Sequence, residues 1–297
     1  MILYERGLLD FDDPLSKYIS YFKDVKCKDK NNKIVYDCDN EITLLDLMTH
    51  RSGYPNNNEH YPARDNKYRN LDDFVRDVSK YPVEFEPGTD YLYGASYDIL
   101  GRVIEVVSNQ TFYEFLKENI FVPISMVNTK FYIDKNERKN FQVLYRRNNN
   151  LREFTFEYDQ NEYLSGGNGH FGGGGLVSTT PDLMKFCEML LNKGSYKNKK
   201  IISSQAIDMM TTVYTKSSYD NGFYDGWDMG FSLFILNEPL LDGSNAPKGI
   251  YRFAGYHNNH FWIDYKNNLY GLFMARSIPH SKLMVHKLRS VVYNIIN

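Results

Sequence analysis

The sequence is poor in cysteine, in long apolar runs and in net charge, and each shortage excludes a class of protein. Its 297 residues hold three cysteines, too few for a disulfide scaffold or a zinc site built from four cysteines. No apolar stretch approaches the length of a membrane span, and residues 1–7 lack the basic, apolar and cleavage regions of a signal peptide. A net charge of −2 gives no reason to expect nucleic acid as a partner. The cytoplasm is therefore the default compartment.

The three cysteines are Cys27, Cys38 and Cys187. Cys27 and Cys38 flank residues 28–37 symmetrically, so a hairpin there would place them opposite each other. That arrangement permits a cross-strand disulfide in an oxidising compartment. We expect instead two reduced thiols in a loop.

The chain has enough apolar residues for a core, with 42% hydrophobic and 24% charged residues, which fits one large domain or two small ones. Helical periodicity predicts a first helix that Gly7 ends, then helices near 43–49, 71–80, 96–107, 111–122, 180–193, 204–213 and 280–296. The last of these should bury an apolar face made of Leu283, Leu288, Val291, Val292 and Ile295. The final third also predicts short aromatic-rich strands at 231–235, 260–264 and 269–274, with a turn at Asn267-Asn268. Helices followed by antiparallel strands predict an α+β fold.

Residues 86–101 combine a turn with the start of a helix. Pro87-Gly88 ends the preceding segment, and Ser96 is expected to be the N-cap of the helix, with Asp98 near its positive end. Tyr93 therefore lies on a tight turn just before a helix N-terminus, where a phenol can face a cleft beside backbone donors. In a chain with 25 tyrosines, the plain alternative is a tyrosine packed at a turn.

Two further segments carry polar or glycine-rich patterns. Residues 165–175 hold seven glycines but lack the Gly-Lys-Ser/Thr ending of a phosphate loop, so nucleotide binding is excluded and tight turns at a cleft rim are expected. His257 and His260 flank two asparagines, and we expect surface polar residues there. No metal and no other cofactor is implied.

Five segments, in order along the chain, resemble the serine β-lactamase and penicillin-binding-protein superfamily, and its β-lactamase-related esterases in particular. They are residues 7–18, 42–53, 87–101, 174–179 and 261–264. The resemblance implies an antiparallel sheet flanked by helices plus a helical subdomain. It implies a single domain over 1–297, with a mainly helical part at about 40–225 and the sheet and C-terminal helix at 228–297. In this family His50 and Ser52 are structural, and His50 satisfies backbone groups at a helix end.

The chemistry of the family uses three motifs: Ser-x-x-Lys at a helix N-terminus, a tyrosine usually followed by x-Asn, and an edge strand whose N–H group helps to bind the oxyanion. The resemblance implies that Tyr93 is the general base, which a lysine cation would assist by lowering its pKa. It implies that the backbone of Gly255 and Tyr256 supports the oxyanion.

Two positions depart from the family pattern. Ala95 replaces the asparagine, and Phe253 stands where lactamases place a cation. These two residues and Ala254 occupy the implied substrate-binding positions, and the departures favour ester hydrolysis over β-lactam hydrolysis.

The Ser-x-x-Lys motif of the family lies upstream of the segment that residues 7–18 match. We therefore expect a chain that is incomplete at its N-terminus, lacking the nucleophile and the N-terminal strands, with little or no hydrolysis. Ser20-Tyr21-Phe22-Lys23 is a literal Ser-x-x-Lys, a pattern that arises easily by chance, and Ser20 and Lys23 are kept as the alternative nucleophile pair. The implied function is hydrolysis of a small ester or amide. The alternative is a non-catalytic binding or scaffold protein.

Overall fold

The computed structural model describes residues 1–29, 34–56, 68–148, 151–155, 170–216, 225–278 and 280–296. By its internal contacts the chain divides into two units. The first comprises Met1–Asn119 with Ser165–Leu176, and the second comprises Ile120–Leu164 with Val177–Asn297. No helix among the described residues is long and apolar enough to cross a membrane.

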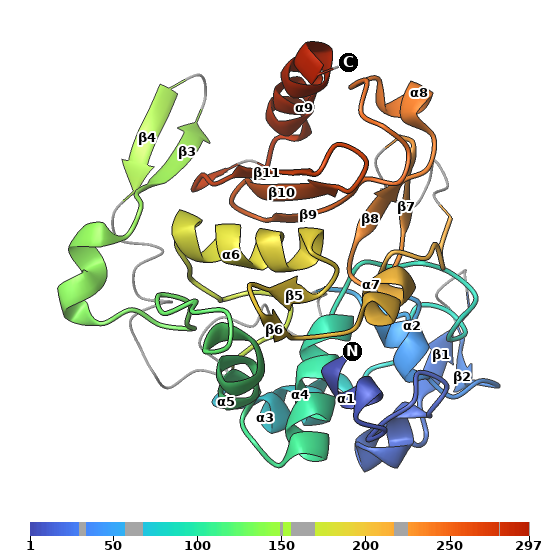
Figure 1. The fold of residues 1–297 in the computed structure, drawn as a ribbon. Coiled ribbons are helices and arrows are strands. Elements are labelled where there is room, and N and C mark those ends of the chain that lie inside the picture. Colours follow the sequence, from blue (N-terminus) through green and yellow to red (C-terminus); the bar gives the residue numbers. More distant parts are fainter. Residues whose placement is uncertain are drawn as a thin grey trace. The chain divides into compact units, whose positions relative to one another are not determined.

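The first unit is mainly helical and contains one small hairpin (Figure 1). Its helix α4 packs against α2 and α3, and the predicted helix near 71–80 is confirmed as α3, with Leu71, Phe74 and Val78 buried. The elements are α1 (Ile2–Glu5), the 3-10 helices η1 (Leu15–Lys17) and η2 (Ser20–Phe22), β1 (Lys26–Lys28), β2 (Val35–Asp37), α2 (Leu44–Met48), α3 (Leu71–Val78), α4 (Ser96–Ser108) and α5 (Phe112–Leu116). A π-helical turn, η3 (Lys117–Phe121), follows α5.

Side-chain caps fix where two of these helices begin. Thr43 and Asp46 form a capping box at α2, and Thr111 and Glu114 form another at α5. The predicted N-cap of α4 is wrong, because Ala95 occupies that position and Ser96 is the first helical residue. The Ser96 hydroxyl bonds instead to the hydroxyl of Ser52, with 2.9 Å between the two oxygens.

The hairpin β1–β2 corrects the expectation of two reduced thiols. A disulfide joins Cys27 and Cys38, whose Cα atoms are 5.2 Å apart. The predicted hairpin is present, but Cys27 pairs with Tyr36 in the register and Cys38 lies just beyond β2. The disulfide therefore joins two residues that are not directly opposite each other in the ladder.

The second unit is built on a five-stranded antiparallel sheet, in the order β11-β10-β9-β8-β7. The predicted turn at Asn267-Asn268 is confirmed between β10 and β11, and Asn268 has a positive φ of 49°. The strands are β7 (Trp227–Met229), β8 (Phe234–Leu236), β9 (Tyr251–Gly255), β10 (Asn259–Asp264) and β11 (Leu269–Phe273). Smaller pairings join β3 (Leu144–Asn148), β4 (Leu151–Thr155) and β12 (Ser277–Ile278), and β5 (Ser195–Tyr196) with β6 (Lys199–Lys200).

Helices cover both sides of this sheet. Figure 1 shows α6 (Thr180–Leu191) and α9 (Lys282–Ile296) on opposite sides of the strands, and α6 contacts β10 and β11. Helix α6 begins at the predicted position, with Thr179 as its N-cap and Pro181 in its first turn. The remaining helices are η4 (Lys135–Asn140), α7 (Ser204–Met210) and α8 (Pro239–Asp242).

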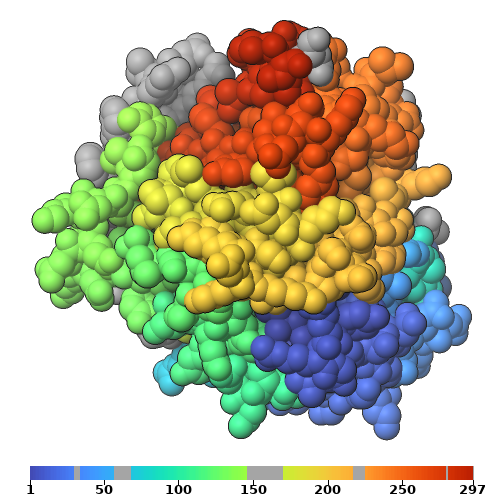
Figure 2. All heavy atoms as spheres, in the orientation of Figure 1, coloured from blue at the N-terminus to red at the C-terminus, as the bar shows by residue number. Residues whose placement is uncertain are grey.

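The face of α9 that packs against the unit differs from the predicted one. Val285, Arg289 and Tyr293 are buried, whereas Leu283, Val291 and Ile295 are exposed. Polar bonds explain the choice, because Arg289 pairs with Asp242 and the Tyr293 hydroxyl donates to Asp264. Figure 2 shows α9, in red, at the surface.

Candidate functional site

Tyr93 lies on a turn whose backbone is hydrogen-bonded to one residue, His50. The carbonyl of His50 accepts the N–H of Leu92 at 2.9 Å, and its Nδ1 accepts the N–H of Gly94 at 3.3 Å. The rings of His50 and Tyr93 lie 4.5 Å apart between centroids. Since Nδ1 accepts a hydrogen bond, the neutral imidazole carries its proton on Nε2. His50 thus supports the turn of Tyr93 in addition to ending α2, which is a wider role than the sequence predicted.

The phenol of Tyr93 remains accessible on this fixed turn. Its side chain is 43% exposed, whereas neighbouring Tyr91 is 9% exposed. Burial, together with the charge that Tyr93 would carry, raises the pKa of the Tyr91 phenol well above its usual range. Tyr91 is therefore a neutral packing residue, and Tyr93 is the exposed phenol of this pair.

The residues that follow Tyr93 are packed tightly against another segment. A Cβ placed on Gly94 would lie 1.8 Å from the carbonyl oxygen of Tyr54, and the N–H of Ala95 donates to that same oxygen at 3.3 Å. The Ala95 side chain is fully buried, at 0% exposure. It offers no polar group where the resemblance would place an asparagine.

The first turn of α4 is tied to the glycine-rich segment. The N–H of Gly173 donates to Oδ1 of buried Asp98 at 2.7 Å, and a Cβ on Gly172 would lie 2.0 Å from the carbonyl oxygen of Tyr97. These two glycines permit a close approach of two backbones. Gly166, Gly167 and Gly169 lie outside the described residues.

The positions of the implied third motif lie at the end of β9, in the second unit. The sheet order places β9 inside the sheet and not at its edge, contrary to the pattern that the resemblance implied. Pairing with β8 nevertheless ends at Arg252, so within the described residues Phe253, Ala254 and Gly255 have ladder partners on β10 alone. Tyr256 follows the strand and is 74% exposed. This short open edge can present backbone donors.

Ser20 and Lys23 lie on the exposed surface of the first unit, in and just after η2. The bond between them is a backbone one, from the N–H of Lys23 to the carbonyl of Ser20 at 3.3 Å. A lysine that activates a serine needs its Nζ within hydrogen-bond reach of the hydroxyl. No such bond joins these two side chains in the part of the chain that the structure describes.

The predicted site residues thus fall into groups that are local in sequence. Tyr93 and Ala95 lie on one turn of the first unit, and Phe253, Ala254, Gly255 and Tyr256 lie at the end of β9 in the second unit.

The family model for Beta-lactamase matches residues 1–285 of this chain. The chain belongs to the β-lactamase family. It is also 25% identical over 307 residues to the N-acetylmuramyl-L-alanine amidase of Bacillus subtilis (strain 168), an alignment that covers 95% of this chain and 65% of that protein. The chain spans 65% of the length of this amidase, and also 65% of the length of two putative D-alanyl-D-alanine carboxypeptidases of Escherichia coli to which it is similar.

Solved structures agree with the family on the fold. The structure titled EstCE1, a hydrolase with promiscuous acyltransferase activity, matches with a TM-score of 0.81 at 18% identity, covering 98% of this chain and 80% of that one. Unliganded simvastatin synthase (LovD) from Aspergillus terreus, a selenomethionyl derivative, matches with a TM-score of 0.76 at 20% identity, covering 99% and 79%. This β-lactamase-family chain therefore has the β-lactamase/transpeptidase-like fold, and it is a homologue of serine hydrolases.

Sequence patterns missed the buried basic residues of the β-lactamase-family sheet. Arg252, just before Phe253, is 2% exposed, and its guanidinium lies over the rings of Trp227 and Phe234. His260 pairs with Ala254 and is also 2% exposed, so its predicted surface position is wrong. The alternation of side chains along β10 could have predicted this burial, because Trp262 is buried and His260, two residues before it, lies on the same face of the strand.

The pKa of His260 is lowered to about 4 by burial and by nearby positive groups, among them His280 and Arg252. Its ring is therefore neutral at neutral pH. His260 is thus an uncharged packing residue on β10, beside Ala254 of β9.

Proposed function

We propose that this domain belongs to an enzyme that hydrolyses small esters or amides through an acyl-serine, with Tyr93 as general base. The observation that carries the proposal is the exposed Tyr93 phenol on a turn whose flanking N–H groups both bond to His50. A phenol held in one place can take the serine proton during attack on the carbonyl and return it to the leaving group.

The oxyanion would be bound by backbone N–H groups at Gly255 and Tyr256. Support comes from the open edge of β9 after Arg252, where the strand has ladder partners on β10 alone among the described residues. Backbone donors at such an edge are fixed before the reaction, and removing one donor of this kind typically costs about 100- to 1,000-fold in rate.

Carboxylesterase-like chemistry fits better than true β-lactamase chemistry. Phe253 stacks on Phe234, with 6.0 Å between ring centroids, and supplies no cation to hold a substrate carboxylate. Ala95 is buried and apolar. The site would therefore favour a neutral acyl group. The names of two relatives, an amidase and a hydrolase with acyltransferase activity, fit acyl transfer more broadly.

The 297 residues alone should show little or no hydrolysis. Their single Ser-x-x-Lys is Ser20–Lys23, on the surface, and we propose that the serine and lysine of the working enzyme come from a segment outside the printed sequence. Support comes from the exposed apolar side chains of α9 and from β11, whose outer edge has no partner among the described residues. Further strands would pair with that edge.

The test compares the printed chain with a version extended upstream in its gene, using p-nitrophenyl butyrate and a fluorophosphonate label. The extended protein should hydrolyse the ester and take up one label per chain, and the printed chain should do neither. Tyr93→Phe should lower kcat by about 100-fold or more, whereas Tyr145→Phe, at a similarly exposed phenol, should not. Equal rates for the two variants would refute Tyr93 as the base.

The alternative is a non-catalytic protein that uses the same fold for binding, and the buried Ala95 and the apolar Phe253 favour it equally. Stoichiometric labelling that disappears when the upstream serine is mutated would exclude this alternative. An extended protein that takes up no label would establish it. If labelling of the printed chain depended on Ser20, the surface pair Ser20 and Lys23 would instead be the nucleophile site.

A further inference from the structure

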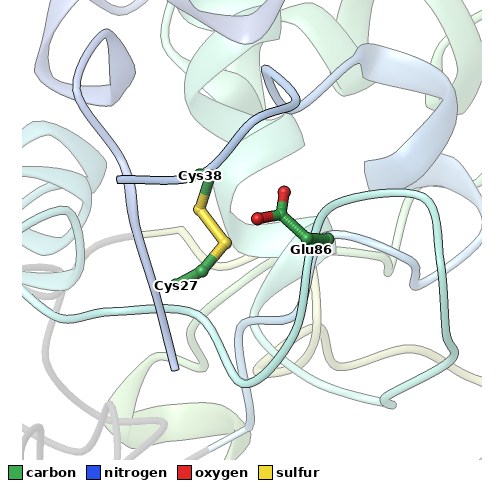
Figure 3. Close-up of side chains that lie close together, drawn as sticks. All are labelled: Cys27, Cys38 and Glu86. Atoms are coloured by element: carbon green, nitrogen blue, oxygen red, sulfur yellow. A yellow bond between two sulfur atoms is a disulfide. The ribbon is translucent and has the colours of Figure 1, made fainter. Parts of the chain in front are cut away.

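Two cysteines and a glutamate of the first unit lie close together, and the glutamate is on the segment that precedes the Tyr93 turn. Cys27 lies on β1, Cys38 lies just after β2, and Glu86 precedes Pro87. Their two sulfur atoms and a carboxylate oxygen all lie within 4.8 Å of one another. Figure 3 shows the Glu86 carboxylate beside the disulfide. Among the described residues this is the one such group of three or more.

Backbone hydrogen bonds place the two cysteines independently of the sulfur–sulfur bond. Beside Cys27, the N–H of Lys28 donates to the carbonyl of Val83 at 2.9 Å, and the N–H of Val83 donates to the carbonyl of Lys26 at 2.8 Å. The N–H of Cys38 donates to the carbonyl of Val25 at 3.2 Å. Reduction of the disulfide would therefore leave both side chains in this neighbourhood.

Glu86 is oriented by two backbone groups on the Cys38 side. Its carboxylate accepts the N–H of Asp39 at 3.1 Å and the N–H of Asn40 at 3.3 Å. The Tyr36 side chain is a further hydrogen-bond partner of this carboxylate. An ionised carboxylate has about four acceptor positions, so these three donors leave a lone pair for one more partner. Outer contacts of this kind commonly hold a metal ligand in its binding orientation.

We propose that, once Cys27 and Cys38 are reduced, their two thiolates and the Glu86 carboxylate bind one zinc ion, with water as the fourth ligand. A dithiol reductant supplies two electrons and two protons, which break the S–S bond and give two thiols while the reductant becomes a disulfide. Zinc then displaces both thiol protons as its bonds to sulfur form. The disulfide and the metal site are mutually exclusive states of the same two sulfur atoms.

The dimensions of the cluster suit a tetrahedral ion. Zinc lies about 2.3 Å from sulfur and about 2.1 Å from oxygen, which places neighbouring ligand atoms roughly 3.6–3.8 Å apart. The present separations are all within 4.8 Å, so these distances can be reached when side-chain rotation moves the two sulfur atoms apart and brings the carboxylate oxygen closer to them. Cys27 is fully buried, while Cys38 and Glu86 are half-buried, so the site is sheltered on one side and open to water on the other.

Ligand type and charge select the metal. Two thiolates favour zinc over magnesium or calcium, which prefer oxygen ligands. Three anionic ligands around Zn²⁺ leave a net charge of −1.

The experiment uses the full 297-residue chain, reduced with a phosphine and desalted without oxygen. Titration with Co²⁺ should produce the thiolate-to-cobalt charge-transfer band and the visible bands of a tetrahedral site, saturating at one ion per chain. Zn²⁺ should displace the cobalt. The disulfide form should bind neither ion. A reduced chain without these bands would overturn the proposal.

Variants separate this site from other thiols. Cys27→Ser and Cys38→Ser should each abolish the bands, whereas Cys187→Ser, at the buried free cysteine outside the cluster, should leave them unchanged. Glu86→Gln keeps an oxygen to accept from Asp39 and Asn40 and preserves the cysteines, so it should fold and weaken zinc binding by at least tenfold. Unchanged affinity in Glu86→Gln would show that the carboxylate is no ligand and that the three-ligand site is wrong.

Discussion

Replacing Gly94 with alanine should destabilise the first unit strongly, although it adds a single methyl group. The new Cβ would lie 1.8 Å from the carbonyl oxygen of Tyr54 and 2.7 Å from the carbonyl carbon of Pro55. Both neighbours are backbone atoms, so no side-chain rotation relieves the clash. The two segments must separate, and the bonds from Gly94 to His50 and from Ala95 to Tyr54 would lengthen with them.

The cost follows from those losses. Overpacking typically costs about 1–3 kcal/mol, and each weakened backbone hydrogen bond adds about 1 kcal/mol. With two such bonds weakened, we expect a loss of about 3–5 kcal/mol in the free energy of unfolding. For a domain of this size, that corresponds to a fall in Tm of roughly 6–20 °C.

Gly101→Ala is the matched control, because Gly101 lies within α4 and its nearest neighbour is the flexible Leu71 side chain at 3.0 Å. Alanine is favoured over glycine inside a helix by about 1 kcal/mol, which offsets a small adjustment of Leu71. Urea denaturation followed by circular dichroism should place Gly101→Ala within about 1 kcal/mol of the parent chain. If Gly94→Ala were equally mild, the close approach of the Tyr93 turn to Tyr54 would be refuted.

Two further predictions concern buried ionisable groups of the second unit. The pKa of His260 in the folded chain is lowered to about 4, so the unfolded chain binds more protons than the folded chain between about pH 6.5 and 4. As pH falls through that window, up to about 3 kcal/mol of the free energy of unfolding should be lost. Urea midpoints measured across it should change less in His260→Phe, and an identical slope would contradict this. Buried Asp182 accepts bonds from the N–H of Asn128 at 2.7 Å and the hydroxyl of Thr129 at 3.0 Å, and it pairs with Lys185 at 3.0 Å. By the same assay, Asp182→Ala should lower the free energy of unfolding by about 3 kcal/mol, and Lys185→Ala should lower it by less than about 1 kcal/mol. Similar losses in the two variants would contradict the interpretation that several donors together stabilise the Asp182 charge.

Features whose partners lie close in sequence were predictable. The capping boxes Thr43–Asp46 and Thr111–Glu114 need groups three residues apart, and both are present. The turn at Asn267-Asn268 likewise depends on the preference of asparagine for positive φ. The five family segments then supplied the fold, which no local pattern would have given.

Features that depend on distant partners were not predictable. Ser96 has an ordinary N-cap residue type, but a hydroxyl 44 residues earlier, on Ser52, determines its hydrogen bond. The apolar stripe of α9 was a sound local signal, yet two polar bonds, from Arg289 to Asp242 and from Tyr293 to Asp264, turn the opposite face inward. The pairing of Cys27 with Cys38 required the register of β1 and β2, which spacing alone left open.

The turn that carries Tyr93 is stabilised by a residue from outside its own motif. The sequence around Tyr93 specifies a turn, but the two N–H groups that fix this turn bond to His50, which itself holds a positive φ of 56° at the end of α2. A non-glycine residue in that conformation is held there by its surroundings. The position of the phenol therefore depends on the end of α2 as much as on residues 86–101. His50→Ala should consequently move Tyr93 without altering the turn sequence, so the general-base proposal predicts a loss of kcat in the extended protein without a matching change in KM.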